Sequence, residues 1–103
     1  MAYSLDRIET MEHVLNSMQD NIENLQAALV NYKDKLPQYE ALLRYYGSSE
    51  YRDDLDAMEQ NRLPSNLACG VLTEDAVYNM IFEQKKLLEN LLELSLKITQ
   101  LNY

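Results

Sequence analysis

The strongest constraint on this fold is an apolar stripe along the first third of the chain, at alternating spacings of 3 and 4 residues. Such spacing places residues on one face of an α-helix, at the a and d positions of a heptad. It predicts a long amphipathic helix over about residues 4–36, with Ser4 as its N-cap. All nine positions, here called the heptad seam, are apolar or aromatic: Ile8, Met11, Leu15, Met18, Ile22, Leu25, Leu29, Tyr32 and Leu36.

The middle of the chain predicts two short helices. Pro37 lacks an N–H and clashes with the preceding turn, so it either kinks or ends the long helix, and both alternatives remain open. Because proline also suits the first turn of a helix, a short helix is expected over about residues 38–46, with Gly47 at its C′ position. A second short helix is expected over about residues 49–61, with one of two adjacent serines as its N-cap.

A second long helix is predicted over about residues 74–101. Thr73 is a suitable N-cap, and Glu74 and Asp75 would place negative charge in the first turn. Heptad spacing recurs here, with seven of eight positions apolar: Val77, Met80, Gln84, Leu87, Leu91, Leu94, Ile98 and Leu101. Leu88 and Leu92 widen this stripe, so it needs more than one neighbour.

These elements predict an all-α fold with one domain over residues 1–103. Only 2 Gly and 2 Pro occur in the chain, too few for the frequent turns of an all-β domain. The expected architecture is an antiparallel hairpin of the two long helices, capped by the two short helices between them. The broad leucine face of the last helix suggests that dimerisation could complete this small bundle.

Composition excludes several classes of partner. The net charge of −8 disfavours nucleic acid and anionic membrane surfaces. No segment has the ~20 apolar residues of a membrane span, and no signal peptide is evident. The single cysteine, Cys69, suits a reducing compartment, so a cytoplasmic location is expected.

Catalytic, cofactor and metal motifs were sought in the sequence without result. His13 and Cys69 are single residues of their types, too few for a catalytic triad or a structural zinc site. The acidic residues of 53–59 lack the glycine and ligand spacing of a calcium loop, so they predict a solvated face. We therefore expect no enzyme and no cofactor; a remote alternative is an enzyme that uses Tyr46 with Asp54 or Asp75.

Tyrosines crowd the middle of the chain and the start of the last helix. Their amphipathic rings could fill a thin core or form a binding surface, and the sequence leaves both alternatives open. The candidate interaction surface adds the neighbouring charged residues and the widened leucine face. Its members are Tyr39, Arg44, Tyr45, Tyr46, Tyr51, Asp54, Tyr78, Leu88 and Leu92.

Several short blocks resemble a family of short bacterial proteins that is catalogued only as a domain of unknown function. The blocks are Tyr45-Tyr46-Gly47-Ser48, Asp54, Leu63-Pro64, and Gly70-Val71-Leu72-Thr73-Glu74-Asp75 followed by Tyr78-Asn79. The resemblance covers nearly the whole chain. It implies a bacterial cytosolic protein and assigns no activity.

The leading functional hypothesis is a non-catalytic module that binds a protein partner or a second copy of itself. The wide apolar stripe and the tyrosine crowding motivate it. The alternative is an acidic antagonist, either an immunity-type protein or a nucleic-acid mimic that occupies a basic site. The charge of −8 motivates that alternative, although it is spread along both long helices.

Overall fold

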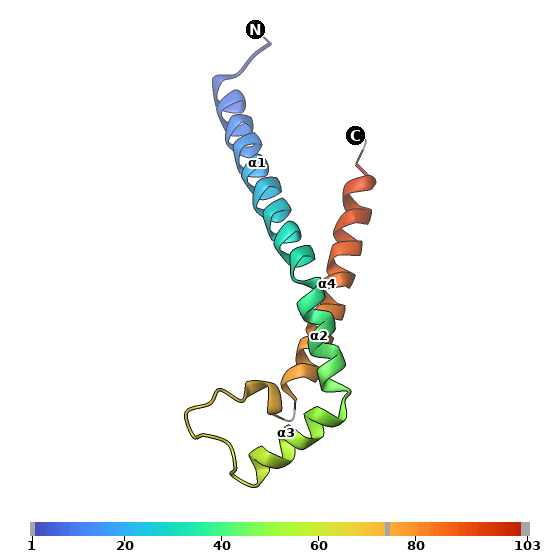
Figure 1. Cartoon of the computed structure of the whole chain (residues 1–103). Helices are drawn as coiled ribbons and strands as arrows, with labels where there is room; N and C mark the ends of the chain where they lie inside the picture. Colours follow the sequence, from blue (N-terminus) through green and yellow to red (C-terminus); the bar gives the residue numbers. More distant parts are fainter. Residues whose placement is uncertain (1, 74, 102–103) are drawn as a thin grey trace. The chain divides into compact units, whose positions relative to one another are not determined.

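The computed structural model describes residues 2–73 and 75–101, and no strand occurs among them. The elements in chain order are α1 (Leu5–Asp34), α2 (Leu36–Tyr46), α3 (Ser49–Glu59), the 3₁₀ helix η1 (Gly70–Leu72) and α4 (Ala76–Thr99) (Figure 1). A long helix, two shorter helices and a long final helix follow one another as predicted. The all-α class is therefore confirmed.

The chain divides into two compact units, residues Met1–Leu43 and Arg44–Tyr103. The boundary falls inside α2, so the first unit holds α1 with most of α2, and the second holds the remaining elements. The single-domain organisation and the antiparallel packing of the two long helices stay predictions.

Helix α1 begins and ends where local hydrogen bonding requires. At its start, the backbone N–H of Arg7 donates to the Ser4 Oγ at 3.2 Å, which confirms the predicted N-cap. At its end, Lys35 is the single residue between α1 and α2. Because Pro37 has no N–H, the ladder of helical hydrogen bonds cannot pass through it. Pro37 lies in the first turn of α2, so the proline separates two helices.

No residue of α1 is buried. The side chains of the heptad seam are exposed by 37% at Leu29 to 63% at Ile22. An amphipathic helix gains most of its stability in a protein by packing its apolar face. Within the first unit, the seam is therefore uncovered along its whole length.

The C-terminal ends of the two short helices, α2 and α3, differ from the ends predicted from the sequence. Gly47 follows α2 but does not take the left-handed backbone that a C′ glycine usually adopts. Instead, the backbone N–H of Ser48 donates to the Tyr45 carbonyl at 3.0 Å and closes the turn. The left-handed residue is Asn61, with φ of 58°, after α3.

Asn61 ends α3 in a Schellman motif. The N–H of Arg62 donates to the carbonyl of Ala57 at 2.9 Å, and the N–H of Asn61 donates to that of Met58 at 3.1 Å. Asparagine tolerates a positive φ better than other residues with a Cβ atom. Helix α3 consequently ends at Glu59, two residues before the predicted boundary.

The start of α4 corrects the prediction for Thr73. The Thr73 Oγ1 donates to the Gly70 carbonyl at 2.6 Å, and its backbone N–H donates to the same oxygen at 3.2 Å. Both groups close η1, and the N-cap position of the next helix belongs to Asp75, two residues later. Helix α4 begins at Ala76, and Asp75, its N-cap residue, makes no side-chain capping bond. Glu74, expected in the first turn, lies outside the described residues.

The second unit has a very small core. Leu72 of η1 and Val77 of α4 are exposed by 5% and 4%, and they are the buried hydrophobic residues of the described chain. Helix η1 contacts both α3 and α4. The side chain of Leu72 therefore sits where three elements meet. Among the described residues, no helix is both long enough and apolar enough to cross a membrane.

This core gives a stability prediction. Replacing Leu72 by alanine should lower the free energy of unfolding by about 2 kcal/mol, because the variant leaves a cavity between three elements. Leu67→Ala is the matched control, since Leu67 is 53% exposed, and its effect should stay below about 0.5 kcal/mol. Urea unfolding followed by circular dichroism measures both values. Equal effects of the two variants would contradict the assignment of Leu72 to the core.

Candidate functional site

Three of the predicted tyrosines meet where α2 turns into α3. The rings of Tyr45 and Tyr51 lie edge to face with centroids 5.5 Å apart, and those of Tyr46 and Tyr51 with centroids 5.2 Å apart. Edge-to-face packing is a favoured arrangement of aromatic rings. We call Tyr45, Tyr46, Ser48, Tyr51 and Asp54 the tyrosine turn.

Ser48 holds the tyrosine turn together from its centre. Its Oγ donates to the Tyr45 carbonyl at 2.6 Å and accepts from the Tyr51 N–H at 3.2 Å. The first bond ties Ser48 to the end of α2, and the second makes it the N-cap of α3. The predicted serine cap is thus confirmed, and of the two adjacent serines it is Ser48.

Tyr45 also donates a side-chain hydrogen bond across the turn. Its hydroxyl donates to the Asp54 carboxylate at 2.6 Å. This bond, followed by desolvation and by the negative charge of Asp54, raises the pKa of Tyr45 from 10.0 to about 12. The hydroxyl is therefore held in its protonated, donating form, which suits a structural bond and opposes use of Tyr45 as a base or nucleophile near neutral pH.

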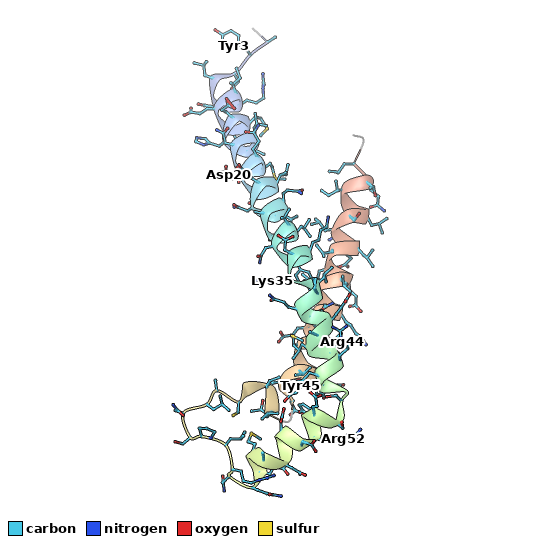
Figure 2. All side chains as sticks on the ribbon, in the orientation of Figure 1. Tyr3, Asp20, Lys35, Arg44, Tyr45 and Arg52 are labelled. Atoms are coloured by element: carbon cyan, nitrogen blue, oxygen red, sulfur yellow. The ribbon has the colours of Figure 1, made fainter. Side chains whose placement is uncertain are left out.

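The other predicted surface residues take part in none of these hydrogen bonds or ring contacts. Figure 2 shows Arg44 beside Tyr45 at the end of α2, with Arg52 on α3. Tyr78, Leu88 and Leu92 lie on α4 and are 61%, 50% and 72% exposed. Tyr39 belongs to the other unit, where it is half-buried.

The partner of Asp54 was not apparent from the sequence. The remote enzyme alternative paired Asp54 with Tyr46, whereas the structure pairs it with Tyr45. Tyr45 and Asp54 lie nine residues apart on two different helices. Their contact depends on the turn geometry at Ser48, and no helical periodicity crosses that turn.

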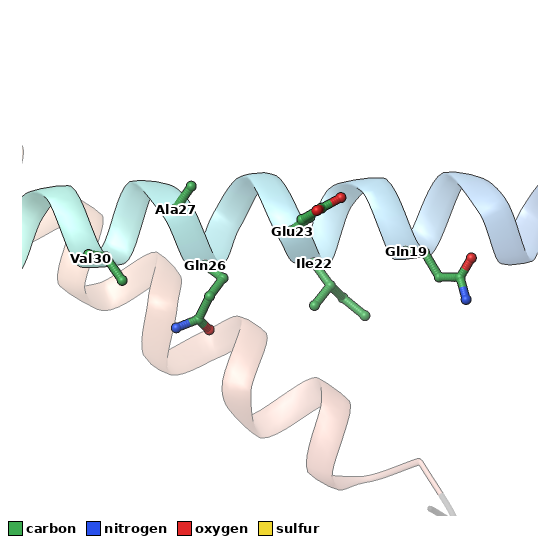
Figure 3. Close-up of a pocket in the computed structure, with 6 residues that line it drawn as sticks. All are labelled: Gln19, Ile22, Glu23, Gln26, Ala27 and Val30. Carbon is green, nitrogen blue, oxygen red and sulfur yellow. The ribbon is translucent and has the colours of Figure 1, made fainter.

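The described part of the chain holds no group of three or more His, Cys, Asp or Glu side chains that could bind a metal ion. A hollow on α1 is lined by residues of that helix alone (Figure 3): Gln19, Ile22, Glu23, Gln26, Ala27 and Val30. Such a hollow follows from neighbouring side chains of unequal size. It touches the heptad seam at Ile22, while its other lining residues lie beside the seam at e, b and f positions.

The polar residues of α1 are arranged around the heptad seam in a definite order. With Ile8 at position a, five of the six acidic residues of α1 occupy the b and f positions on the outer face: Asp6, Glu9, Asp20, Glu23 and Asp34. The flanking e and g positions carry few charges, namely Arg7, Glu12 and Lys33. The seam is thus an apolar strip with mostly neutral edges and an acidic back.

The bond from Tyr45 to Asp54 gives a pH prediction. In Asp54→Asn the acceptor loses its charge, so the pKa of Tyr45 should fall from about 12 toward 10. The wild-type stabilisation by this bond is fully present below pH 10 and is lost as the pH rises through about 12, because the folded-state pKa is the raised one.

Ultraviolet titration of phenolate formation measures the change in the pKa of Tyr45. In the wild type, one of the eight tyrosines should titrate late, and in Asp54→Asn this late step should be lost. Asp53→Asn is the control, since it removes the same charge from the neighbouring residue of α3. If Asp54→Asn and Asp53→Asn give the same titration curve as the wild type, the hydrogen bond does not control the pKa of Tyr45.

Comparison with known proteins gives one match. No curated protein and no solved structure matches the chain. A family model described as a domain of unknown function, DUF4298, matches residues 8–94. The match begins at the first residue of the heptad seam and includes the whole tyrosine turn, in agreement with the resemblance predicted from the short blocks. The chain therefore belongs to the DUF4298 family, a domain of unknown function.

Proposed function

We propose that the protein is a non-catalytic helical interaction module, and that its binding face is the heptad seam of α1. The observation that carries this proposal is that all nine seam residues, eight on α1 and Leu36 at the start of α2, are exposed, and that neither helix holds a buried residue. Contiguous exposed apolar surface of this kind marks interaction sites. The heptad spacing specifies another helix as the partner element, because its period is that of knobs-into-holes packing.

The size of the seam supports the proposal. Nine side chains that are each about half exposed could bury on the order of 700 Å² on this chain alone, close to one partner's share of a standard interface. The layout of charge also fits. Acidic residues at the b and f positions would stay in water when the seam is covered, so binding would require little desolvation of charge.

The hydrogen bonds of the tyrosine turn support a structural role for these residues, distinct from the binding role of the seam. The hydroxyl-to-carboxylate bond and the serine cap are both satisfied within the turn. We assign these residues to holding α2 and α3 together, and the exposed Arg44 and Arg52 to its solvent-facing rim.

Site-specific photocrosslinking tests the binding face. A benzophenone amino acid at Leu25 of the seam should form covalent adducts with a protein in cells that express the chain at native level. The matched control places the same residue at Asn24, an exposed neighbour at an outer position of α1, where adducts should be absent. If neither position forms an intermolecular adduct, or if Leu25 crosslinks only within its own chain, the seam is not a binding face.

A further inference from the structure

We infer that the occupant of the heptad seam is a second copy of this chain, in a parallel, in-register, two-stranded coiled coil of α1 helices. This inference rests on the proposed function and names its partner. Three properties of α1 support it: the residues of the core layers, the charges that flank them, and the area that pairing would bury.

The core layers fit two parallel strands. Positions a of α1 would be Ile8, Leu15, Ile22 and Leu29, and positions d would be Met11, Met18, Leu25 and Tyr32. Parallel dimers favour β-branched residues at a and unbranched or γ-branched residues at d. Both isoleucines of the seam fall at a, and no β-branched residue falls at d.

The flanking charges distinguish the two possible orientations. In a parallel pair, each g residue faces the e residue five positions later in its partner. Arg7 then faces Glu12 of the second copy, once on each side of the dimer. The remaining g positions of α1 are Val14, Asn21 and Ala28, so no like charges face one another within this helix pair.

An antiparallel pair that used the same full seam would instead bring Arg7 opposite Lys35 of the second copy, on one side of the interface. Opposed like charges disfavour that arrangement. An antiparallel pair shifted by one heptad avoids this contact and brings Glu12 opposite Lys33, but it leaves Ile8 without a partner in the core. The parallel register is therefore the one that uses all eight seam residues of α1 and adds attractive charge pairs.

The second copy also fits in charge and in area. Both chains are strongly acidic, with a net charge of −8 each, yet five of the six acidic residues of each α1 would point away from the shared seam. Burying both seams would remove on the order of 1,400 Å² from water, within the range of specific, stable interfaces. A basic partner is not required to neutralise this face.

Sedimentation velocity tests the association. The full-length wild type should sediment at twice the 12.0 kDa chain mass at micromolar concentration. Leu25→Asp should weaken the dimer on the order of 100-fold or more, because it places a charge in a core layer of both copies. Asn24→Asp adds the same charge on the outer face, and its dissociation constant should stay within about threefold of wild type.

Disulfide trapping tests the orientation. With Cys69 replaced by serine, Met18→Cys should form a crosslinked dimer on oxidation, because residue 18 faces itself only in the parallel register. Mixing the single variants Met18→Cys and Ile22→Cys would instead yield the mixed disulfide if the pair is antiparallel. That result would overturn the parallel coiled coil.

The failure of this inference can be told from failure of the proposed function. A wild type that sediments as a monomer up to high micromolar concentration overturns the second copy as partner. If such a monomer still forms adducts from Leu25 with another protein, the interaction module stands and its partner is different. If no intermolecular adduct forms either, both proposals fail.

Discussion

The rest of this structure depends on how the apolar face of α1 is covered. Eight seam side chains lie on one side of the thirty-residue helix α1, the ninth is Leu36 of α2, and none is buried. An isolated helix of this length has only marginal stability in water, because propensity adds little per residue. The seam therefore couples the folding of the first unit to whatever helix covers it, and in a homodimer association and folding of α1 would be a single event.

The second unit is stabilised by different means. Its core consists of Leu72 and Val77, with local bonds at each connection: the serine cap of α3, the Schellman motif at Asn61 and the closure of η1 by Thr73. Such contacts join residues that are close in sequence. They fix the direction in which the chain continues after each helix, and they add little to the volume of the core. The tyrosine turn belongs to this group, because its rings and its hydroxyl bond act between two helices joined by only two residues.

The helices whose sequence signals are periodic or strictly local could be predicted from the sequence. The heptads located α1 and α4, Ser4 and Ser48 located two helix starts, and Pro37 located the division between α1 and α2. The prediction was wrong where one residue could form hydrogen bonds with either of two neighbouring elements. Thr73 could cap either of two elements, and its hydroxyl closes the preceding one. A left-handed residue was expected at Gly47, after α2, whereas the residue with a positive φ is Asn61, after α3. The Tyr45–Asp54 contact was missed because its two residues are brought together only by the turn between their helices.

The single-residue gap at Lys35 has a mechanical consequence. A two-stranded coiled coil underwinds each helix from about 3.6 to 3.5 residues per turn, and the resulting supercoil extends as far as the helical hydrogen bonds continue. Here that continuity ends one residue before α2 begins. Any twist that α1 takes up on pairing would accordingly be absorbed at Lys35, and α2 would keep its own helical phase. The gap would act as a torsional release between α1, the helix that assembles, and α2, the short helix that follows it.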